Sequence, residues 1–179
     1  MGIDDIKTCP FLKAGLFIQP NGLTRACSQW GRPMRGLNSN FSIDNHITMV
    51  GNIDVGQSCV SCIIAEQNDG INSMRKLIDD RLWPKVTVSM SNTCNAACVI
   101  CSETSSTRIL EEKRRGNIML EYPLDELRSY VDLAPRKKDL VIEAIRHYRA
   151  EYDRPVVLEV LGGDVSVDTH AMSLLNDLM

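Results

Sequence analysis

Three closely spaced cysteines constrain this chain more than any other feature of its sequence. Cys94, Cys98 and Cys101 stand in a C-x3-C-x2-C spacing. They follow directly on residues 85–90, whose β-branched content and near-alternation predict a β-strand. Because βα folds carry their active sites at the carboxyl ends of strands, the sequence indicates a site where three thiols converge.

Three thiolates on one loop suit a metal centre that keeps a coordination position open. Iron–sulfur clusters are usually held by four cysteines, so three ligands leave one iron available for a further group. A structural zinc site normally has four ligands, and here the fourth would have to come from elsewhere, such as His147 or His170. Cysteines that only pack in a core are the remaining alternative.

Four further cysteines, Cys9, Cys27, Cys59 and Cys62, lie in the first half of the chain. The total of seven is high and odd, and clustered thiols in a reducing compartment indicate metal or redox ligands rather than disulfides. Four thiols complete a ligand set for zinc or for an iron–sulfur cluster, and the ligand types alone do not separate the two.

Charge and hydropathy exclude several classes of partner. The formal net charge of −3 argues against a general nucleic-acid binder, which would show a basic excess. No apolar run approaches the roughly 20 residues that span a bilayer, so we expect no membrane partner. The first residues also lack the basic and apolar regions of a secretory signal, and we therefore expect a cytoplasmic protein.

Local signals change character near residue 80. In the first half, Gln19-Pro20-Asn21-Gly22 lies between two short apolar segments and predicts a β-hairpin. Residues 31–58 predict only a loop with short strands, whereas the apolar face of residues 71–82 predicts a helix.

The second half has the order strand, cysteine loop, helices, strand and helix, which is typical of a βα repeat with parallel strands. The expected second strand covers residues 156–161, and the expected helices cover residues 105–115, 125–133, 135–152 and 169–179. Two short basic runs, residues 113–115 and 136–138, are typical of solvated helix faces.

A second motif, Gly162-Gly163-Asp164, ends the second predicted strand. Adjacent glycines let the backbone approach a ligand without an intervening Cβ. Together with the C-x3-C-x2-C loop, this segment resembles the radical S-adenosylmethionine superfamily, whose members carry Gly-Gly-Glu at this place. Asp164 keeps the charge of that Glu on a side chain one methylene shorter.

The resemblance implies that Cys94, Cys98 and Cys101 hold a [4Fe–4S] cluster whose open iron is chelated by S-adenosylmethionine. Reductive cleavage of the cofactor then gives a 5′-deoxyadenosyl radical that abstracts a hydrogen atom, in many relatives from a peptide or protein. The resemblance further implies an electron donor such as flavodoxin or ferredoxin. The cofactor-binding residues that it implies are Gly162, Gly163, Asp164 and Ile100.

The first half resembles the twitch or SPASM-like segment of these enzymes through Cys9-Pro10, Cys27, the Cys59 and Cys62 pair, and the following Glu66, Gly70, Ser73 and Arg75. This resemblance implies a second, auxiliary iron–sulfur cluster on Cys9, Cys27, Cys59 and Cys62, with zinc as the alternative. The implied fold class is α/β. A small cysteine-rich β-hairpin and loop domain at residues 1–80 precedes the first βα units of a partial (β/α)6 barrel at residues 81–179.

The length of the second half limits how much of that barrel can form. Six βα units need on the order of 190 residues, whereas the 95 residues from Lys85 to Met179 accommodate about two. We therefore expect a fragment, a truncated product, or half of an assembly that another chain completes. The alternative function is a non-catalytic iron–sulfur or zinc-binding module.

Overall fold

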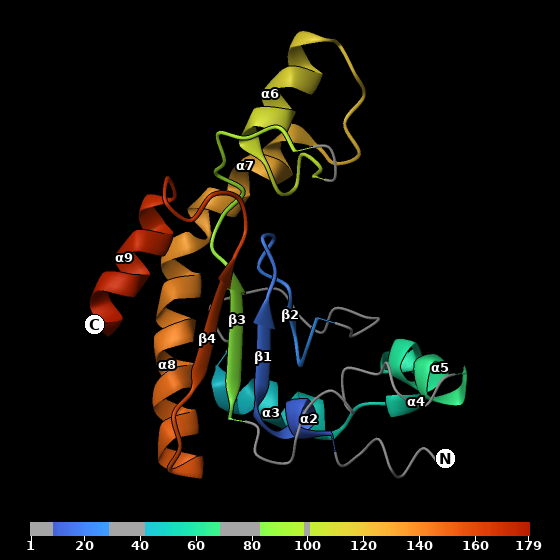
Figure 1. The fold of residues 1–179 in the computed structure, drawn as a ribbon, viewed down its shortest axis with the longest axis vertical. Helices are drawn as coiled ribbons and strands as arrows, with labels where there is room; N and C mark the ends of the chain where they lie inside the picture. The colour runs from blue at the N-terminus through green and yellow to red at the C-terminus, as the bar shows by residue number, and fades with distance from the viewer. Residues whose placement is uncertain (1–8, 29–41, 69–82, 99–100) are drawn as a thin grey trace.

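The computed structural model describes residues 9–28, 42–68, 83–98 and 101–179. Its centre is a four-stranded sheet with the order β2-β1-β3-β4 (Figure 1). Strands β1, β3 and β4 run parallel, and β2 pairs antiparallel with β1. The strands are β1 (Gly15–Ile18), β2 (Thr24–Arg25), β3 (Lys85–Ser89) and β4 (Val157–Leu161). The α/β class is confirmed, and the sheet is mixed and open, with β4 at one edge.

A tight turn joins β1 to β2. The Leu23 N–H donates to Asn21 Oδ1 at 3.1 Å, and Gly22 has a φ of 77°, a value that favours glycine. On its other side β1 pairs in parallel with β3, from Gly15 opposite Lys85 to Ile18 opposite Val88. The strand before the turn therefore belongs to the same sheet as the two strands of the second half.

The helices expected in the second half form within about two residues of their predicted bounds. Ser106 and Asp168 supply the side-chain caps of α6 and α9, and Asp153, with a φ of 47°, ends α8. The helices are α2 (Pro10–Ala14), α3 (Ile43–Gly51), α4 (Val55–Ser58), α5 (Val60–Asn68), α6 (Thr107–Arg115), α7 (Leu124–Asp132), α8 (Ala134–Tyr152) and α9 (Thr169–Leu178).

The expectation of a loop with short strands over residues 31–58 is wrong where the structure describes that segment, because α3 and α4 lie there. The Ser42 hydroxyl accepts the Asn45 N–H at 3.3 Å and caps α3. Ile43, His46 and Val50 then form one buried helix face. Residues 31–41 and the helix predicted at 71–82 lie outside the described residues.

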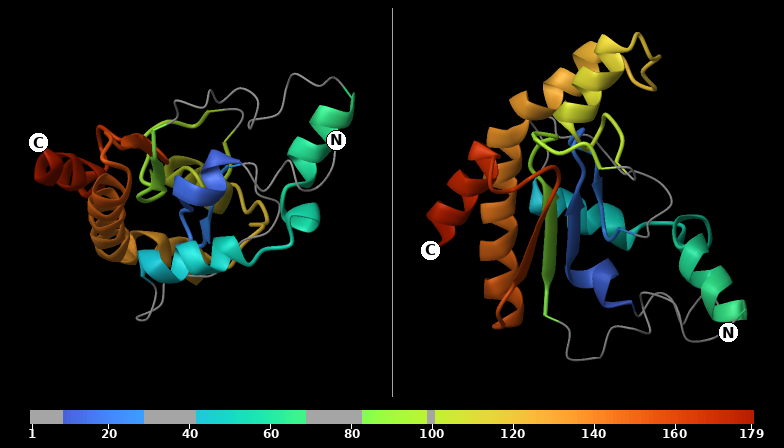
Figure 2. Two further views of the ribbon diagram at one scale, coloured as in Figure 1. Left: turned by 90° about the horizontal axis from the view of Figure 1, so that it is seen from below. Right: turned by 45° about the horizontal axis from the view of Figure 1, so that its top comes forward.

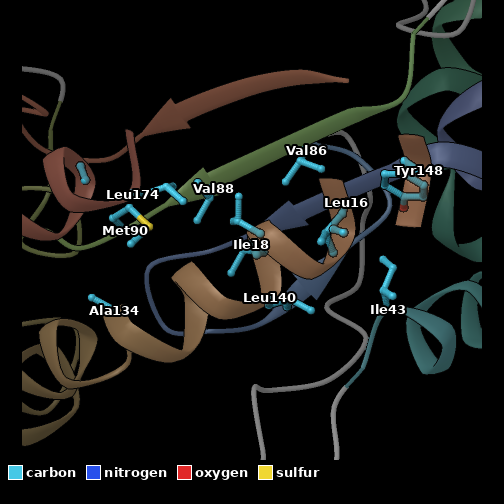
Figure 3. Packing of buried hydrophobic residues seen from close by; sticks show 13 residues of the cluster. Leu16, Ile18, Ile43, Val86, Val88, Met90, Ala134, Leu140, Tyr148 and Leu174 are labelled. Carbon is cyan, nitrogen blue, oxygen red and sulfur yellow. The ribbon is translucent and has the colours of Figure 1, made fainter. Parts of the chain in front are cut away.

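One face of the sheet is covered by helices. Side chains of β1 and β3 pack against α8, with α3 and α9 completing the same cluster (Figures 2 and 3). The centre of this core is formed by Leu16, Ile18, Val86, Val88, Leu140 and Val141. The packing leaves the carboxyl ends of β3 and β4 at one end of the sheet, where the cysteine loop begins. No helix of the described segments is long and apolar enough to cross a membrane.

Candidate functional site

The three predicted cluster ligands lie on the loop that leaves the carboxyl end of β3. Cys94 and Cys101 are half-buried and Cys98 is exposed. Burial raises the pKa of Cys101, and the neighbouring thiols of Cys98 and Cys94 raise it further. The structure therefore brings the three thiols into one neighbourhood. Ile100, the predicted adenine contact, lies outside the described residues.

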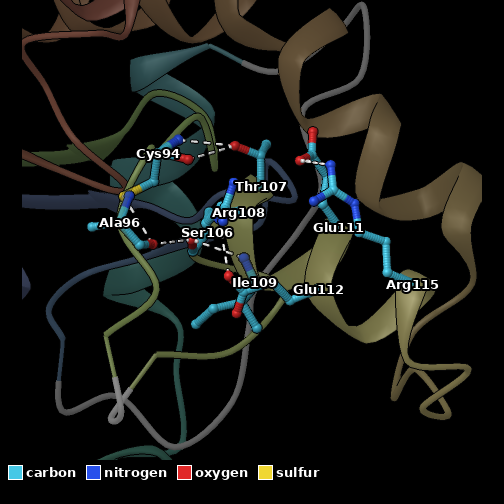
Figure 4. Close-up of polar contacts among 9 residues, drawn as sticks. All are labelled: Cys94, Ala96, Ser106, Thr107, Arg108, Ile109, Glu111, Glu112 and Arg115. Carbon is cyan, nitrogen blue, oxygen red and sulfur yellow. Dashed lines mark hydrogen bonds and ion pairs between the residues drawn. The ribbon is translucent and has the colours of Figure 1, made fainter.

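The start of α6 fixes the backbone of this loop (Figure 4). The Cys94 N–H donates to Thr107 Oγ1 at 3.0 Å, and the Thr107 hydroxyl donates back to the Cys94 carbonyl at 2.9 Å. The neighbouring Ser106 hydroxyl donates to the Ala96 carbonyl at 2.7 Å. Two side chains of the helix cap thus satisfy backbone groups that a loop of this kind would otherwise leave to water.

The sulfur of Cys94 also receives a hydrogen bond. The Ala96 N–H lies 3.4 Å from Cys94 Sγ and points toward it (Figure 4). Hydrogen bonds to cysteine sulfurs are among the factors that set the reduction potential of iron–sulfur clusters. The loop therefore has a donor in the position that a ligating thiolate would use.

The Gly-Gly-Asp segment packs directly on the cysteine loop. A Cβ on Gly163 would lie 2.1 Å from the Thr93 carbonyl oxygen and 2.7 Å from Cys94 Cβ, and one on Gly162 would lie 2.7 Å from the Ser91 carbonyl oxygen. The Asp164 N–H donates to the same Thr93 carbonyl at 3.0 Å. No residue with a side chain fits at either glycine unless the loop moves away.

The carboxylate of Asp164 lies at the surface beside this contact. Its Oδ1 accepts hydrogen bonds from the Ser166 hydroxyl at 2.6 Å and from the Ser166 N–H at 2.9 Å. These bonds lower the pKa of Asp164, so the group is an anion at neutral pH. A cationic amino group is the kind of ligand that this position can attract.

Sequence reasoning missed Glu103, a fully buried carboxylate just after the third cysteine. Burial alone would raise its pKa. Hydrogen bonds from Lys113 Nζ at 2.6 Å and from the Glu121 N–H at 2.7 Å outweigh burial and lower it. These two hydrogen bonds to Glu103 tie the loop to α6 and to the segment before α7. No local pattern marks Glu103, because its partners lie 10 and 18 residues away.

Asp168 and Lys137 are two further buried groups that the sequence did not reveal. Asp168 Oδ2 accepts the Ser91 hydroxyl at 2.7 Å, while its Oδ1 caps α9. The expectation that residues 136–138 form a solvated face is wrong for Lys137, which is fully buried. Its ammonium group faces inward because three backbone carbonyls accept its hydrogen bonds. Burial lowers the pKa of Lys137 to about 7, and the Asp168 carboxylate opposes that shift.

The other four cysteines gather at the amino end of the sheet, opposite the three-thiol loop. Cys9 precedes α2, Cys27 follows β2, and Cys59 and Cys62 belong to the α4–α5 segment. Burial raises the pKa of Cys59 to about 12, with further contributions from the thiols of Cys27, Cys9 and Cys62. Thiols from three separate segments therefore share one neighbourhood. Glu66 is buried on α5, and Gly70, Ser73 and Arg75 lie outside the described residues.

Both thiol groups consist of residues of a type that can bind a metal. None of the seven cysteines forms a disulfide. Across the described ranges, no three His, Cys, Asp or Glu side chains converge closely enough to hold an ion as they stand, so the thiols would have to turn toward a common centre. His147 lies instead beside Asp44 of α3, with 3.6 Å between Nδ1 and Oδ1.

Comparison of the chain with protein-family models, with curated proteins and with solved structures finds no match. The assignment of a function therefore depends on the residues and contacts described above.

Proposed function

We propose that this chain is a radical S-adenosylmethionine iron–sulfur protein with a [4Fe–4S] cluster on Cys94, Cys98 and Cys101. The observation that carries the proposal is the packing of Gly162-Gly163-Asp164 against the cysteine loop, with the Asp164 N–H 3.0 Å from the Thr93 carbonyl oxygen. Two motifs more than 60 residues apart in the sequence meet at the carboxyl ends of adjacent parallel strands. Ligand sites of α/β folds lie at such ends.

When bound, the reduced cluster and S-adenosylmethionine supply a 5′-deoxyadenosyl radical for hydrogen abstraction. The chain's own residues have simpler tasks. Three thiolates bind iron, and the Ala96 N–H stabilises the charge on Cys94 Sγ. The absence of a Cβ at Gly162 and Gly163 lets this segment pack directly against the cysteine loop. The anionic Asp164 offers its carboxylate to the amino group of the cofactor.

The same proposal gives the four-thiol group at Cys9, Cys27, Cys59 and Cys62 an auxiliary iron–sulfur cluster, with zinc as the alternative metal. It also includes a cytoplasmic location, a flavodoxin or ferredoxin as electron donor, and a peptide or protein substrate. In this reading β3 and β4 are strands of a partial (β/α)6 barrel, and residues 1–80 form the auxiliary-cluster domain and also supply β1, which pairs with β3.

A second candidate is an iron–sulfur or zinc-binding module that does not cleave the cofactor. The position of the thiols favours it, because both groups lie at the ends of strands that are present in the described sheet and could bind a metal there without a closed barrel. A catalytic barrel would need more strands to surround the cofactor.

Anaerobic reconstitution with iron and sulfide tests the proposal. We expect a brown protein with about eight irons per chain if both clusters are of the four-iron kind. Reduction in the presence of S-adenosylmethionine should then release 5′-deoxyadenosine, and Cys98→Ser should abolish that release. Clusters without 5′-deoxyadenosine would favour the second candidate. Bound zinc with no uptake of iron would contradict an iron–sulfur protein altogether.

A further inference from the structure

Lys137 is a fully buried lysine next to the cysteine loop, and the proposed chemistry leaves it without a role. It lies in the first turn of α8. A positive charge is disfavoured there, because the amino end of a helix is itself the positive end of the helix dipole. Burial of an ammonium group adds a further cost. Local helix energetics therefore do not account for a lysine at this position.

The contacts of its ammonium group do account for it. Lys137 Nζ donates to the carbonyls of Pro20 at 2.6 Å, Met90 at 2.7 Å and Tyr130 at 3.3 Å. An ammonium group has three donors, so each has one acceptor. The three carbonyls belong to the turn between β1 and β2, to the residue that follows β3, and to α7.

The Met90 contact connects the lysine to the thiols. Met90 is the first residue after β3, and the cysteine loop continues from it through Ser91. The Ser91 hydroxyl donates to Asp168 Oδ2, and the Asp168 carboxylate attracts the charge of Lys137. Two buried side chains therefore hold adjacent residues at the base of the loop: Lys137 binds the Met90 carbonyl, and Asp168 binds the Ser91 hydroxyl.

We infer that Lys137 is a positioning residue for the three-thiol loop. Its three hydrogen bonds fix the base of the loop relative to the β1–β2 turn and to α7. This inference rests on the proposed function, because the loop needs a fixed base only if its thiols bind a cluster. The role is separable from general stability. Lys137→Met leaves the Pro20, Met90 and Tyr130 carbonyls without this donor, and the lost Met90 contact would release the three-thiol loop but not the thiols at the other end of the sheet.

The test measures thiol alkylation in the reduced, metal-free full chain, with the rate at each cysteine read by mass spectrometry. In Lys137→Met, the alkylation rates of Cys94 and Cys101 should rise about tenfold, because local opening of the loop costs less free energy. Those of Cys59 and Cys62, at the other end of the sheet, should stay within about twofold. Lys138→Met is the matched control, since Lys138 Nζ binds Ser173 on α9 and not the loop.

Unchanged rates at Cys94 and Cys101 would overturn the inference, and so would an equal rise at all seven thiols, which indicates general loosening. If Lys137→Met does not fold, Lys137→Gln, which keeps two donors, is judged by the same criterion. Failure of both variants to fold would also overturn it, because the lysine would then be a general stabilising residue. The readout needs no iron, so a wild-type chain that takes up no cluster refutes the proposed function without deciding the role of Lys137.

Discussion

The two thiol groups lie at opposite ends of one sheet and are built in different ways. Cys94, Cys98 and Cys101 come from a single loop that α6 and the Gly-Gly-Asp segment hold by direct contacts. The other group collects Cys9, Cys27 and the Cys59–Cys62 pair from three segments of the first half. β3, which separates the two ends, is about 15 Å long at its usual rise per residue.

This difference determines what each group needs in order to form. Closing a short loop costs little conformational entropy. The hydrogen bonds of Thr107 and Ser106 shape this loop whether or not a metal is present. Segments far apart in sequence must be brought together before their thiols can share a metal, so metal binding and folding are coupled there. The backbone of the three-thiol loop is therefore shaped before any metal binds, whereas a metal at the four-thiol group would also have to join separate segments.

The largest expected effect is the loss of iron when one cysteine of either thiol group is replaced. After reconstitution, Cys98→Ser and Cys59→Ser should each lose about four of the eight irons, since each removes one four-iron cluster. Only Cys59→Ser should also expose the α4–α5 segment to proteolysis, because the metal proposed there would join separate segments. Iron analysis and limited digestion measure the two effects. Equal digestion of both variants would remove the distinction between a loop that is shaped without metal and a group whose metal would join separate segments.

The sequence predicted the elements around the three-thiol loop well because their signals are local. A β-branched run marks β3, Ser106 caps α6, and Pro135 lies in the first turn of α8. The Gly-Gly-Asp motif is equally local, since its three residues are adjacent in the sequence. The structure added the reason for its glycines, which is the absence of space for a Cβ beside Thr93 and Cys94.

What the sequence could not reveal depends on contacts between distant segments. Lys137 stands in a run of three basic residues and so resembles a solvated residue, yet its acceptors are 7, 47 and 117 residues away. The burial of Glu103 depends in the same way on Lys113 and Glu121. In residues 31–58, scattered glycines concealed the helical spacing of Ile43, His46 and Val50. Side-chain burial of this kind follows from tertiary packing and not from periodicity.

The next effect tests how closely the three-thiol loop is packed. Gly163→Ala places a Cβ 2.1 Å from the Thr93 carbonyl oxygen, a backbone atom that cannot turn aside. We expect a loss of about 3 kcal/mol in the free energy of unfolding by urea, together with loss of iron from this loop. Gly51→Ala is the control, since a Cβ there has no neighbour within 4 Å, and its change should stay below about 0.5 kcal/mol. Similar changes in the free energy of unfolding for the two variants would show that the loop backbone moves aside to accommodate the new Cβ.

A smaller effect concerns the charge pair behind the same loop. Lys113→Met leaves the buried Glu103 carboxylate without its cation and should cost about 2 kcal/mol in urea unfolding. Arg108→Ala breaks the exposed pair with Glu112 and should cost less than about 0.5 kcal/mol. In the double variant Glu103→Gln with Lys113→Met, much of the loss should be recovered because no unpaired charge remains. No recovery would mean that Lys113 acts through packing and not through its charge.

The smallest effect lies at the four-thiol end and depends on pH. His46 Nε2–H donates to the Gly15 carbonyl at 3.0 Å, next to the start of β1, and burial lowers the pKa of His46 below its usual 6.5. Below about pH 6.5, His46 binds a proton in the unfolded chain but not in the folded chain, so the free energy of unfolding falls as the pH falls. Between pH 7.5 and 5.5, the free energy of urea unfolding should fall by about 1 kcal/mol more in the wild type than in His46→Gln. An equal fall in both would assign the acid sensitivity to other groups and would leave this end of the sheet no more sensitive to acid than the three-thiol end.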